Sequence, residues 1–453
     1  MANTTPAETA APPAPAISKI DAGHPRRAMY LDWLREVTGR PTAAGHEGCV
    51  LGWVNAWLSE RPDLTTRTDP HGNVEIRFAD VTPTDADRPV YFTAHLDHPA
   101  FVCCGEHEGN PALEFRGGVM AEYFLDGRVV VCPAGGTGPG EAVAGTLRGQ
   151  AWDPKQRDTE TDSGGTATPS SDRGGVGGLF PVYTFEPDDA SKAAALTPGD
   201  VGVWELPAPE VIDDEFGGIF YTNACDDLAA LAGALAALEE LRLARAGGKA
   251  AGGGGVGDVR VLLTRAEEIG FVGAIGACEG CFMPRGSRVI ALENSRSFPA
   301  DSPIHGGPIV RVGDRISVFS PELTSAISEV AKGLAGRDAT PRASEKQHEG
   351  GWKWQRKLMA GGACEASVYC AYGYESTCVC LPLGNYHNMA NLAEVQAGTF
   401  EGPPRVGREH IGLDDFFGMV DLLAACGLSL DDRPSFRERV SKLWAERKWV
   451  VGS

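Results

Sequence analysis

The sequence predicts an α/β fold, in which a mixed, largely parallel sheet is covered by helices and a small β-barrel is inserted into the chain. Strand-like runs alternate with helical runs before residue 100 and again after residue 220, which is typical of parallel sheets with both faces covered. Between these two parts the chain changes to short strand-like pieces, many glycines and closely spaced turn residues. This second pattern is typical of a small barrel.

These patterns divide the chain into three parts. Residues 1–22 are rich in Ala and Pro and lack the basic start and apolar core of a secretory signal, so we expect a disordered tail. Residues 23–100 and 220–453 are expected to form the α/β domain. Residues 101–219 are expected to form the inserted barrel, with a polar, low-complexity flexible loop at 153–177.

The first elements of the α/β domain follow from periodicity. Residues 26–40 and 45–60 carry the apolar spacing of helices. The runs HGNVEIRF (71–78) and RPVYFTAHLD (88–97) predict strands. Within the insertion, four further runs predict the strands of the barrel: EYFLDGRVVVC, EAVAGTLRG, FPVYTF and DVGVWEL.

The α/β pattern returns after the insertion. DDLAALAGALAALEELRLAR (226–245) is apolar on nearly all faces, which predicts a buried helix, and AGGKAAGGGGVGD after it is expected to be a flexible loop. VRVLLT and RVIALEN predict strands on either side of a helix near 270–283. The remaining expected elements are a helix at 320–335, a strand at 377–384, and helices at 413–426 and 434–446.

Composition limits the classes of partner. The chain has 453 residues, of which 42% are hydrophobic and 23% are charged, and it contains no apolar run near the roughly 20 residues of a membrane span. A net charge of −20 disfavours nucleic acid and anionic membrane as partners. The twelve cysteines have no regular spacing, so we expect reduced, buried thiols in a cytoplasmic protein.

Polar side chains lie at or just beyond strand ends and helix starts, where ligands gather in open α/β sheets. They are His95 and Asp97 in PVYFTAHLD, Asp226 and Asp227 in YTNACDDLA, Glu267 and Glu268 in VRVLLTRAEE, Glu293 in RVIALEN, and His387 in CLPLGNYHNM. Some have a plain structural explanation, since Asp226 could be a helix cap and His387 a surface residue. Glu293 is the hardest to explain in this way, because an unpaired carboxylate in an apolar strand is costly.

Two histidines and several carboxylates at one sheet edge suit a dinuclear site for zinc, cobalt or manganese. In the arrangement that the residue types favour, Asp226 bridges the two ions. His95 and Glu293 hold one ion, and Glu268 and His387 hold the other.

The same hypothesis explains two adjacent glutamates. Glu268 coordinates, whereas Glu267 stays free to take a proton from the attacking water. Asp97 lies two residues after His95 on the same strand face, so we expect its carboxylate to accept the other imidazole N–H. Nucleophilic catalysis fits poorly, because there is no GxSxG motif and Cys364 has no nearby base in the sequence.

The motifs AHLD, ACDDLA, AEEIGFVGA and GNYHNM resemble, in order and spacing, those of the co-catalytic zinc exopeptidases. The chain is most similar to the tetrahedral and glutamyl aminopeptidases, because its insertion directly follows His-x-Asp. The resemblance covers roughly residues 26–430 and implies a zinc exopeptidase-like α/β fold with Glu267 as general base. It implies five ligands for two divalent metal ions, zinc foremost: His95, Asp226, Glu268, Glu293 and His387.

The resemblance implies a metal-dependent aminopeptidase that acts on short peptides. It also implies a homo-oligomer assembled through the inserted barrel, without specifying a size between dimer and dodecamer. Two alternatives stay open: a deacylase or amidohydrolase of N-acyl amino acids on the same scaffold, and a non-catalytic scaffold or binding protein. The metal-ligand residues do not distinguish a deacylase from an aminopeptidase, because both would use the same ligands. The second is disfavoured because every ligand position and the base are present.

The chain departs from the family pattern in three places. Glu293 stands where Asp is usual, and His98 follows AHLD where Glu is frequent. GGACEAS places Cys364 and Glu365 in a segment that usually reads Gly-Thr-Asp-Ala and lines the substrate site in relatives. Substrate preference therefore does not carry over to this chain.

One basic and aromatic run has no counterpart among these motifs. GGWKWQRK (350–357) combines Lys353, Arg356 and Lys357 with two tryptophans. In so acidic a chain we favour a solvated basic face or an interface. The alternatives are a contact with nucleic acid and the attraction of a substrate carboxylate toward the active site.

Overall fold

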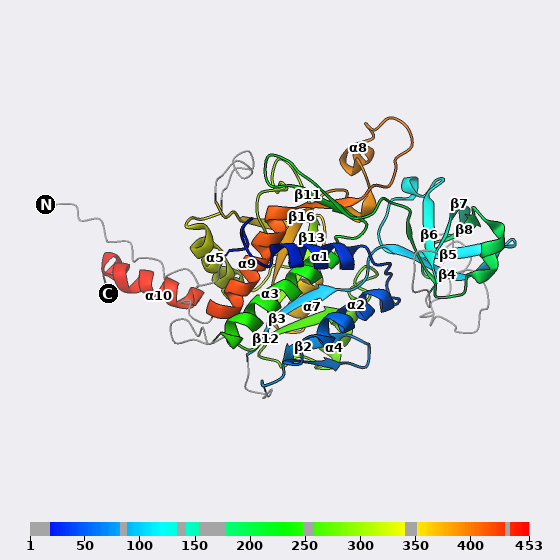
Figure 1. Ribbon diagram of the computed structural model, residues 1–453. Coiled ribbons are helices and arrows are strands. Elements are labelled where there is room, and N and C mark those ends of the chain that lie inside the picture. The colour runs from blue at the N-terminus through cyan, green and yellow to red at the C-terminus, as the bar shows by residue number, and fades with distance from the viewer. Residues whose placement is uncertain are drawn as a thin grey trace, which may run out of the picture.

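A computed structural model of the protein describes residues 19–81, 88–133, 142–153, 178–247, 257–339, 351–430 and 435–452. Most of the expected tail, of the loop at 153–177 and of the glycine-rich loop after the buried helix lies outside these residues. An α/β domain and a barrel lie next to each other along the molecule (Figure 1). Within the described ranges, no helix combines the length and the apolar character that a bilayer crossing requires.

The α/β domain is built on an eight-stranded mixed sheet in the order β1-β2-β12-β3-β13-β16-β14-β15. Its centre consists of four parallel strands, β12 (Val259–Thr264), β3 (Val90–His95), β13 (Arg288–Arg296) and β16 (Glu375–Leu383). All four are buried except for one terminal residue in each of the two longest, as expected for strands covered on both faces. Because they are parallel, the residues that follow them meet at one edge of the sheet.

The outer strands add antiparallel pairings. β1 (Leu64–Thr68) and β2 (Val74–Phe78) are antiparallel to each other, and β2 is antiparallel to β12. On the other side, β14 (Ile309–Asp314) runs antiparallel to β16 and parallel to β15 (Gln355–Met359). The sequence predicted β2 but not β1, β14 or β15, because polar residues interrupt the apolar pattern of these strands.

Helices cover the two faces of the sheet with separate cores. One core joins α1 (Arg27–Thr38), α2 (Gly48–Ser59), α3 (Leu228–Ala246), α5 (Pro321–Ala335) and α9 (Leu413–Ser429). The other joins α4 (Val272–Glu279) and α7 (Glu365–Ala371). Helix α3 is buried continuously from Leu228 to Leu241, which confirms the prediction from its all-round apolar pattern. The last helix, α10 (Phe436–Arg447), extends away from the body at the end opposite the barrel (Figure 1).

The insertion is a closed barrel of six strands in the order β4-β5-β8-β7-β6-β9, which confirms the predicted architecture. Aromatic rings fill it. The ring centroids of Phe101 and Trp204 lie 4.8 Å apart, and those of the stacked Phe124 and Tyr183 lie 4.4 Å apart. The strands are β4 (Ala100–His107), β5 (Asn110–Arg116), β6 (Arg128–Cys132), β7 (Val143–Trp152), β8 (Val182–Pro187) and β9 (Val201–Trp204).

The barrel strands end at Trp204, earlier than the expected boundary at 219. The next strands, β10 (Glu210–Ile212) and β11 (Ile219–Thr222), form a separate three-stranded sheet with β17 (Glu409–Gly412). Because β17 leads directly into α9, this small sheet ties the return of the insertion to the α/β domain.

The start of the described chain packs into the α/β domain, although it lies in the range expected to be a tail. The Ile20 side chain is buried in the core of α3 and α9, and its backbone N–H donates to Asp421 Oδ1 at 3.0 Å. Burial raises the pKa of Asp421 to about 7, although this hydrogen bond favours the ionised form. Between about pH 4 and pH 7, Asp421 is therefore protonated in the folded protein and ionised in the unfolded chain.

This proton predicts a pH-dependent stability. A folded pKa above the unfolded one means that the free energy of unfolding falls as pH rises from about 4 to 7. Asp421→Asn has no charge to desolvate. Its free energy of unfolding, relative to that of the parent, should therefore rise by on the order of 2 kcal/mol between pH 5 and pH 8. Urea unfolding at both pH values measures this, with the exposed Asp32→Asn as control. An equal difference at both pH values would show that Asp421 is ionised in the fold.

Candidate metal centre

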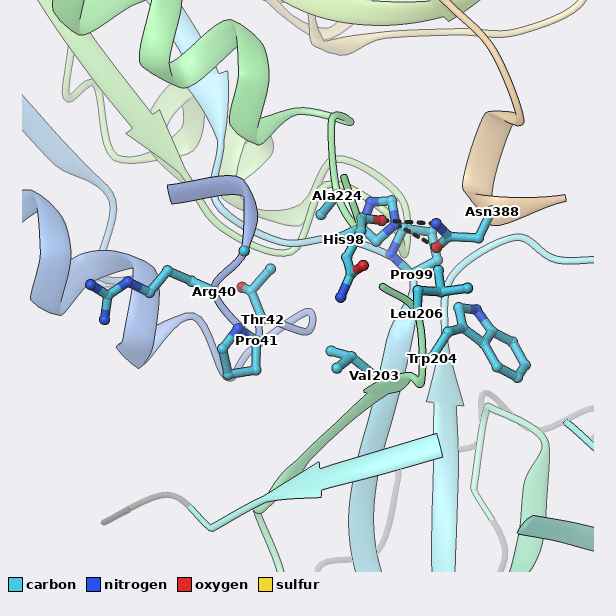
Figure 2. A pocket seen from close by; sticks show the side chains of 12 residues that line it. Arg40, Pro41, Thr42, His98, Pro99, Val203, Trp204, Leu206, Ala224 and Asn388 are labelled. Atoms are coloured by element: carbon cyan, nitrogen blue, oxygen red, sulfur yellow. Dashed lines mark hydrogen bonds between the residues drawn. The ribbon is translucent and has the colours of Figure 1, made fainter. Parts of the chain in front are cut away.

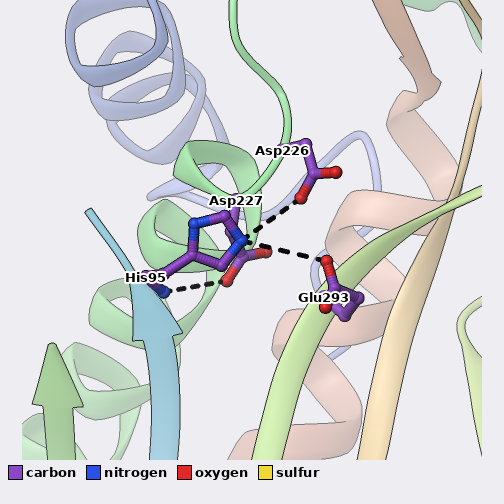
Figure 3. A group of neighbouring side chains, drawn as sticks. All are labelled: His95, Asp226, Asp227 and Glu293. Atoms are coloured by element: carbon purple, nitrogen blue, oxygen red, sulfur yellow. Dashed lines mark hydrogen bonds and ion pairs between the residues drawn. The ribbon is translucent and has the colours of Figure 1, made fainter. Parts of the chain in front are cut away.

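The sheet edge brings the sequence-predicted polar residues together. His95 ends β3, Glu293 lies near the end of β13, and Asp226 and Asp227 directly precede α3. Figure 3 shows these four side chains directed toward one another. The remaining ones come from the connections after the parallel strands: Asp97 after β3, Glu267 and Glu268 after β12, and His387 after β16.

One half of the cluster centres on His95. Its Nε2 lies 3.4 Å from Asp226 Oδ1, 3.9 Å from Glu267 Oε2 and 3.9 Å from Glu293 Oε1. Potential ligand atoms of His95, Asp226, Asp227 and Glu293 all lie within 4.8 Å of one another, and the four residues are buried. A single imidazole thus faces several carboxylates out of contact with solvent.

The other half centres on His387. Its Nε2 lies 3.5 Å from Asp226 Oδ2 and 3.4 Å from Glu268 Oε2. The two oxygens of Asp226 therefore face two different histidines. This is the arrangement expected of a carboxylate placed between two cation positions.

The chemistry of the donor set fits divalent metal ions. His95 Nε2, Asp226 Oδ1 and Glu268 Oε1 are buried and have no hydrogen-bond partner among the described residues. Burial raises the pKa of Glu267, Glu268 and Glu293, to about 8 for Glu293, where Asp226 adds repulsion. Such unpaired groups are costly unless a cation offsets them. Nitrogen and carboxylate oxygen donors suit zinc, cobalt or manganese, so the cluster could hold metal.

Asp97 orients the cluster through contacts that differ from the expected one. Its backbone carbonyl oxygen, at 3.0 Å, contacts His95 Nδ1, whereas its carboxylate lies 3.6 Å away. The carboxylate instead accepts the backbone N–H groups of Glu267 at 2.9 Å and Glu268 at 3.1 Å. Asp97 therefore links the histidine of β3 to the glutamate pair after β12.

The inserted barrel contributes directly to the orientation of His387. The His387 Nδ1 atom lies 2.6 Å from the carbonyl oxygen of Gly118, which follows β5. The Tyr386 ring stacks on the His387 ring at 3.7 Å. This carbonyl directs the opposite ring nitrogen toward Asp226, so the position of the barrel affects the site.

His98, one of the residues at which the chain departs from the resembled pattern, contacts the backbone beside the site. Its Nδ1 lies 2.5 Å from the Asp226 carbonyl oxygen, and its Nε2 lies 3.1 Å from Asn388 Oδ1. His98 and Asn388 line a cavity of about 20 Å³ together with the segment after α1 and strand β9, and Figure 2 shows these side chains. His98 therefore contacts the backbone of the cluster rather than its centre.

Glu409 and Asn294 were missed by sequence reasoning. The buried Glu409 carboxylate accepts the N–H groups of Cys225 and Asp226 at 2.7 and 3.0 Å, and that of His387 at 2.8 Å. Asn294 Nδ2 donates to the Cys225 carbonyl at 3.0 Å and to an Asp227 oxygen at 2.8 Å. Glu409 stands in a short, partly polar strand, so only its tertiary contacts reveal this role.

A second group of potential ligands has a simpler explanation. His305 Nδ1 lies 2.6 Å from Asp414 Oδ1, and its Nε2 lies 2.9 Å from Asp214 Oδ2. Lys353 Nζ pairs with the other Asp414 oxygen at 3.1 Å. These carboxylates are already neutralised by protein cations, so we interpret the group as an ion-pair cluster.

A cavity of about 620 Å³ opens beside Glu293. Residues 361–363 of the glycine-rich segment line it, while Cys364 and Glu365 are buried and are not among its lining residues. The basic residues of the run lie in three environments: Lys353 pairs with Asp414, Lys357 lines this cavity and Arg356 is exposed. The expected solvated basic face therefore describes only part of the run.

The fold is similar to that of aminopeptidases of known structure. A TET aminopeptidase from a marine sediment archaeon of the Thaumarchaeota matches at a TM-score of 0.62 and 16% identity, over 91% of this chain and 99% of that one. TET1 peptidase from Pyrococcus horikoshii matches at 0.59 and 17%, over 88% and 99%. An aminopeptidase from the archaeon Desulfurococcus kamchatkensis also matches at 0.59 and 17%, over 88% and 94%. No protein-family model and no curated protein matches the sequence.

Replacing one carboxylate oxygen of Glu409 by an amide group tests its role. A glutamine retains one accepting oxygen, so Glu409→Gln leaves at least one of the three N–H groups without its partner. We expect a loss of about 1–3 kcal/mol in the free energy of unfolding, measured by urea unfolding in the presence of chelator. The exposed Glu401→Gln is the matched control. Equal stability of Glu409→Gln and its parent would remove Glu409 from this anchoring role.

Proposed function

We propose that the protein is a metal-dependent aminopeptidase that removes the N-terminal residue of short peptides with two divalent metal ions. The observation that carries the proposal is the position of Asp226, whose two oxygens face His95 and His387 at 3.4 and 3.5 Å. In this assignment each oxygen of Asp226 would contribute to one of two ion positions. His95 and Glu293 would complete one position, and His387 and Glu268 would complete the other.

Two divalent ions, zinc foremost and cobalt or manganese otherwise, would supply activation of a water molecule and polarisation of the scissile carbonyl. Glu267 is one of the carboxylates that this assignment leaves free of coordination, and it lies 3.9 Å from His95 Nε2. Its backbone is held by Asp97 at 2.9 Å, which keeps the side chain at the edge of the cluster. Glu267 accepts the proton of the attacking water and returns it to the leaving amine.

Two further observations support the proposed cellular compartment and the proposed homo-oligomer. All twelve cysteines are free thiols, in keeping with the reducing cytoplasm. The TET1 peptidase of similar fold can assemble into a tetrahedron or an octahedral shell, and we propose that this chain forms a homo-oligomer through its barrel. Because Gly118 of the barrel orients His387, assembly and activity share a structural element.

Amino-acid release from a peptide panel tests the reaction. Chelated protein should be inactive on short peptides, and zinc, cobalt or manganese should restore release from peptides with a free N-terminus. N-acylated peptides should remain intact, since an aminopeptidase requires the free amine. Cleavage of only the N-acylated set would replace the proposal by a deacylase on the same scaffold.

The assignment of Glu267 predicts a separation of metal binding from turnover. Glu267→Gln should retain the metal content of the parent and lose about 10²- to 10⁴-fold in kcat, the usual contribution of a general base. Metal analysis and steady-state kinetics on one preparation measure both quantities. The exposed Glu215→Gln serves as control. Undiminished turnover with bound metal would assign the proton transfer to another group.

A further inference from the structure

A buried glutamate, Glu47, holds the turn that precedes the glutamate pair. Glu47 lies directly before α2 and has no exposed surface. Its Oε1 accepts the backbone N–H groups of Gly45 at 2.8 Å and Ala266 at 3.1 Å. Its Oε2 accepts the Nε–H group of Arg265 at 2.8 Å and lies 2.6 Å from Nη2. One carboxylate thus fixes the backbone of Ala266 and the side chain of the residue before it.

Ala266 depends on such support because its backbone is left-handed, with a φ of 52°. In that region the Cβ atom of an L-residue crowds its own backbone, so a residue other than glycine persists only where surrounding contacts hold it. The Ala266 carbonyl accepts the N–H of Val272 at 3.2 Å, within the same turn. The Ala266 N–H donates to Glu47, and this contact joins Ala266 to a distant part of the chain.

The conformation of Ala266 determines the direction of the Glu267 side chain. The Arg265 carbonyl accepts the N–H of Gly273 at 2.8 Å, so residues 265–273 form a closed turn. Glu267 is the first residue after the left-handed position, and its Oε2 lies 3.9 Å from His95 Nε2. A right-handed φ at Ala266 would redirect the following peptide, and with it the side chain of Glu267.

Two buried carboxylates share the N–H groups of this turn. Asp97 accepts those of Glu267 and Glu268, and Glu47 accepts that of Ala266. Three successive N–H groups therefore donate to side chains from two separate segments, one after β3 and one before α2. Asp97 holds the pair itself, whereas Glu47 holds the residue that directs the pair.

We propose that Glu47 positions Glu267 for proton transfer by holding Ala266 in its left-handed conformation, an inference that rests on the proposed function. Among the described residues, none of the hydrogen bonds of the Glu47 carboxylate reaches a candidate metal ligand. Glu47 is therefore a positioning residue for the base, and bound metal does not depend on it.

Glu47→Gln tests this role through kcat and metal content. A glutamine has one accepting oxygen, which the charged Arg265 takes, so the Ala266 N–H loses its acceptor. We expect kcat on a free-amine peptide to fall about 10-fold, as for a small displacement of a catalytic group, with the KM and the metal content of the parent. The exposed Glu60→Gln is the control. Loss of metal from Glu47→Gln, or an unchanged kcat, would overturn the inference.

Rescue by glycine separates positioning from a general loss of stability. Glycine adopts a positive φ without steric cost, so in an Ala266→Gly background the turn no longer needs Glu47 to hold its conformation. There, Glu47→Gln should lower kcat less than about threefold. Ala79→Gly is the matched control, because Ala79 is exposed and its φ is not positive. The same loss of kcat in both backgrounds would contradict the proposed role.

A crystal structure of Glu47→Gln tests the conformation without any substrate. We expect Ala266 to adopt a negative φ and the Glu267 carboxylate to move away from His95. In the double variant with Ala266→Gly, the positive φ should return. A positive φ at Ala266 in the single variant would disprove the role of Glu47, whatever the kinetics show.

The Glu267→Gln background distinguishes a failure here from a failure of the proposed function. Without the base, Glu47→Gln should have no further effect on kcat. If Glu47→Gln lowers kcat by the same factor with and without Glu267, the positioning role fails and the aminopeptidase proposal stands. If no peptide is cleaved but the φ of Ala266 changes as expected, Glu47 still holds the turn and the proposed function fails.

Discussion

Unpaired carboxylates buried at one edge of a parallel sheet impose the constraint on which the rest of the structure depends. Asp226, Glu267, Glu268 and Glu293 crowd around two imidazoles, and Asp226 Oδ1 and Glu268 Oε1 have no hydrogen-bond partner within the described chain. A carboxylate out of water is costly unless opposite charge is near. Among the described residues these carboxylates form ion pairs with histidines and with no Lys or Arg, which is the physical reason for assigning divalent ions to the cluster.

Much of the surrounding structure holds backbone groups rather than ligand atoms. Glu409 accepts three N–H groups from the two connections that carry Asp226 and His387. Asp97 accepts the N–H groups of both adjacent glutamates. Potential ligands on separate loops are thereby kept in place by buried hydrogen bonds between loops. Such support limits the freedom of the side chains before any ion or substrate binds.

The insertion and the outer strands extend the site in different directions. The barrel contributes the Gly118 carbonyl that orients His387. On the other side, β14 and β15 contribute Arg311 and Lys357, which are paired in register and line the cavity beside Glu293. The central parallel strands and the connections after them thus carry most of the candidate ligands, while peripheral elements contact these residues and line the space next to them.

The sequence by itself determined the fold class, the four central strands and the residues of the candidate centre. These could be predicted because a carboxylate or histidine directly after a buried apolar strand is visible in the linear pattern. Only the tertiary structure decided the strand order, the atoms through which Asp97 acts, the anchoring by Glu409 and the pairing of Arg311 with Lys357. Those features depend on the register between segments far apart in the chain, and polar residues in short outer strands carry no periodic signal of that register.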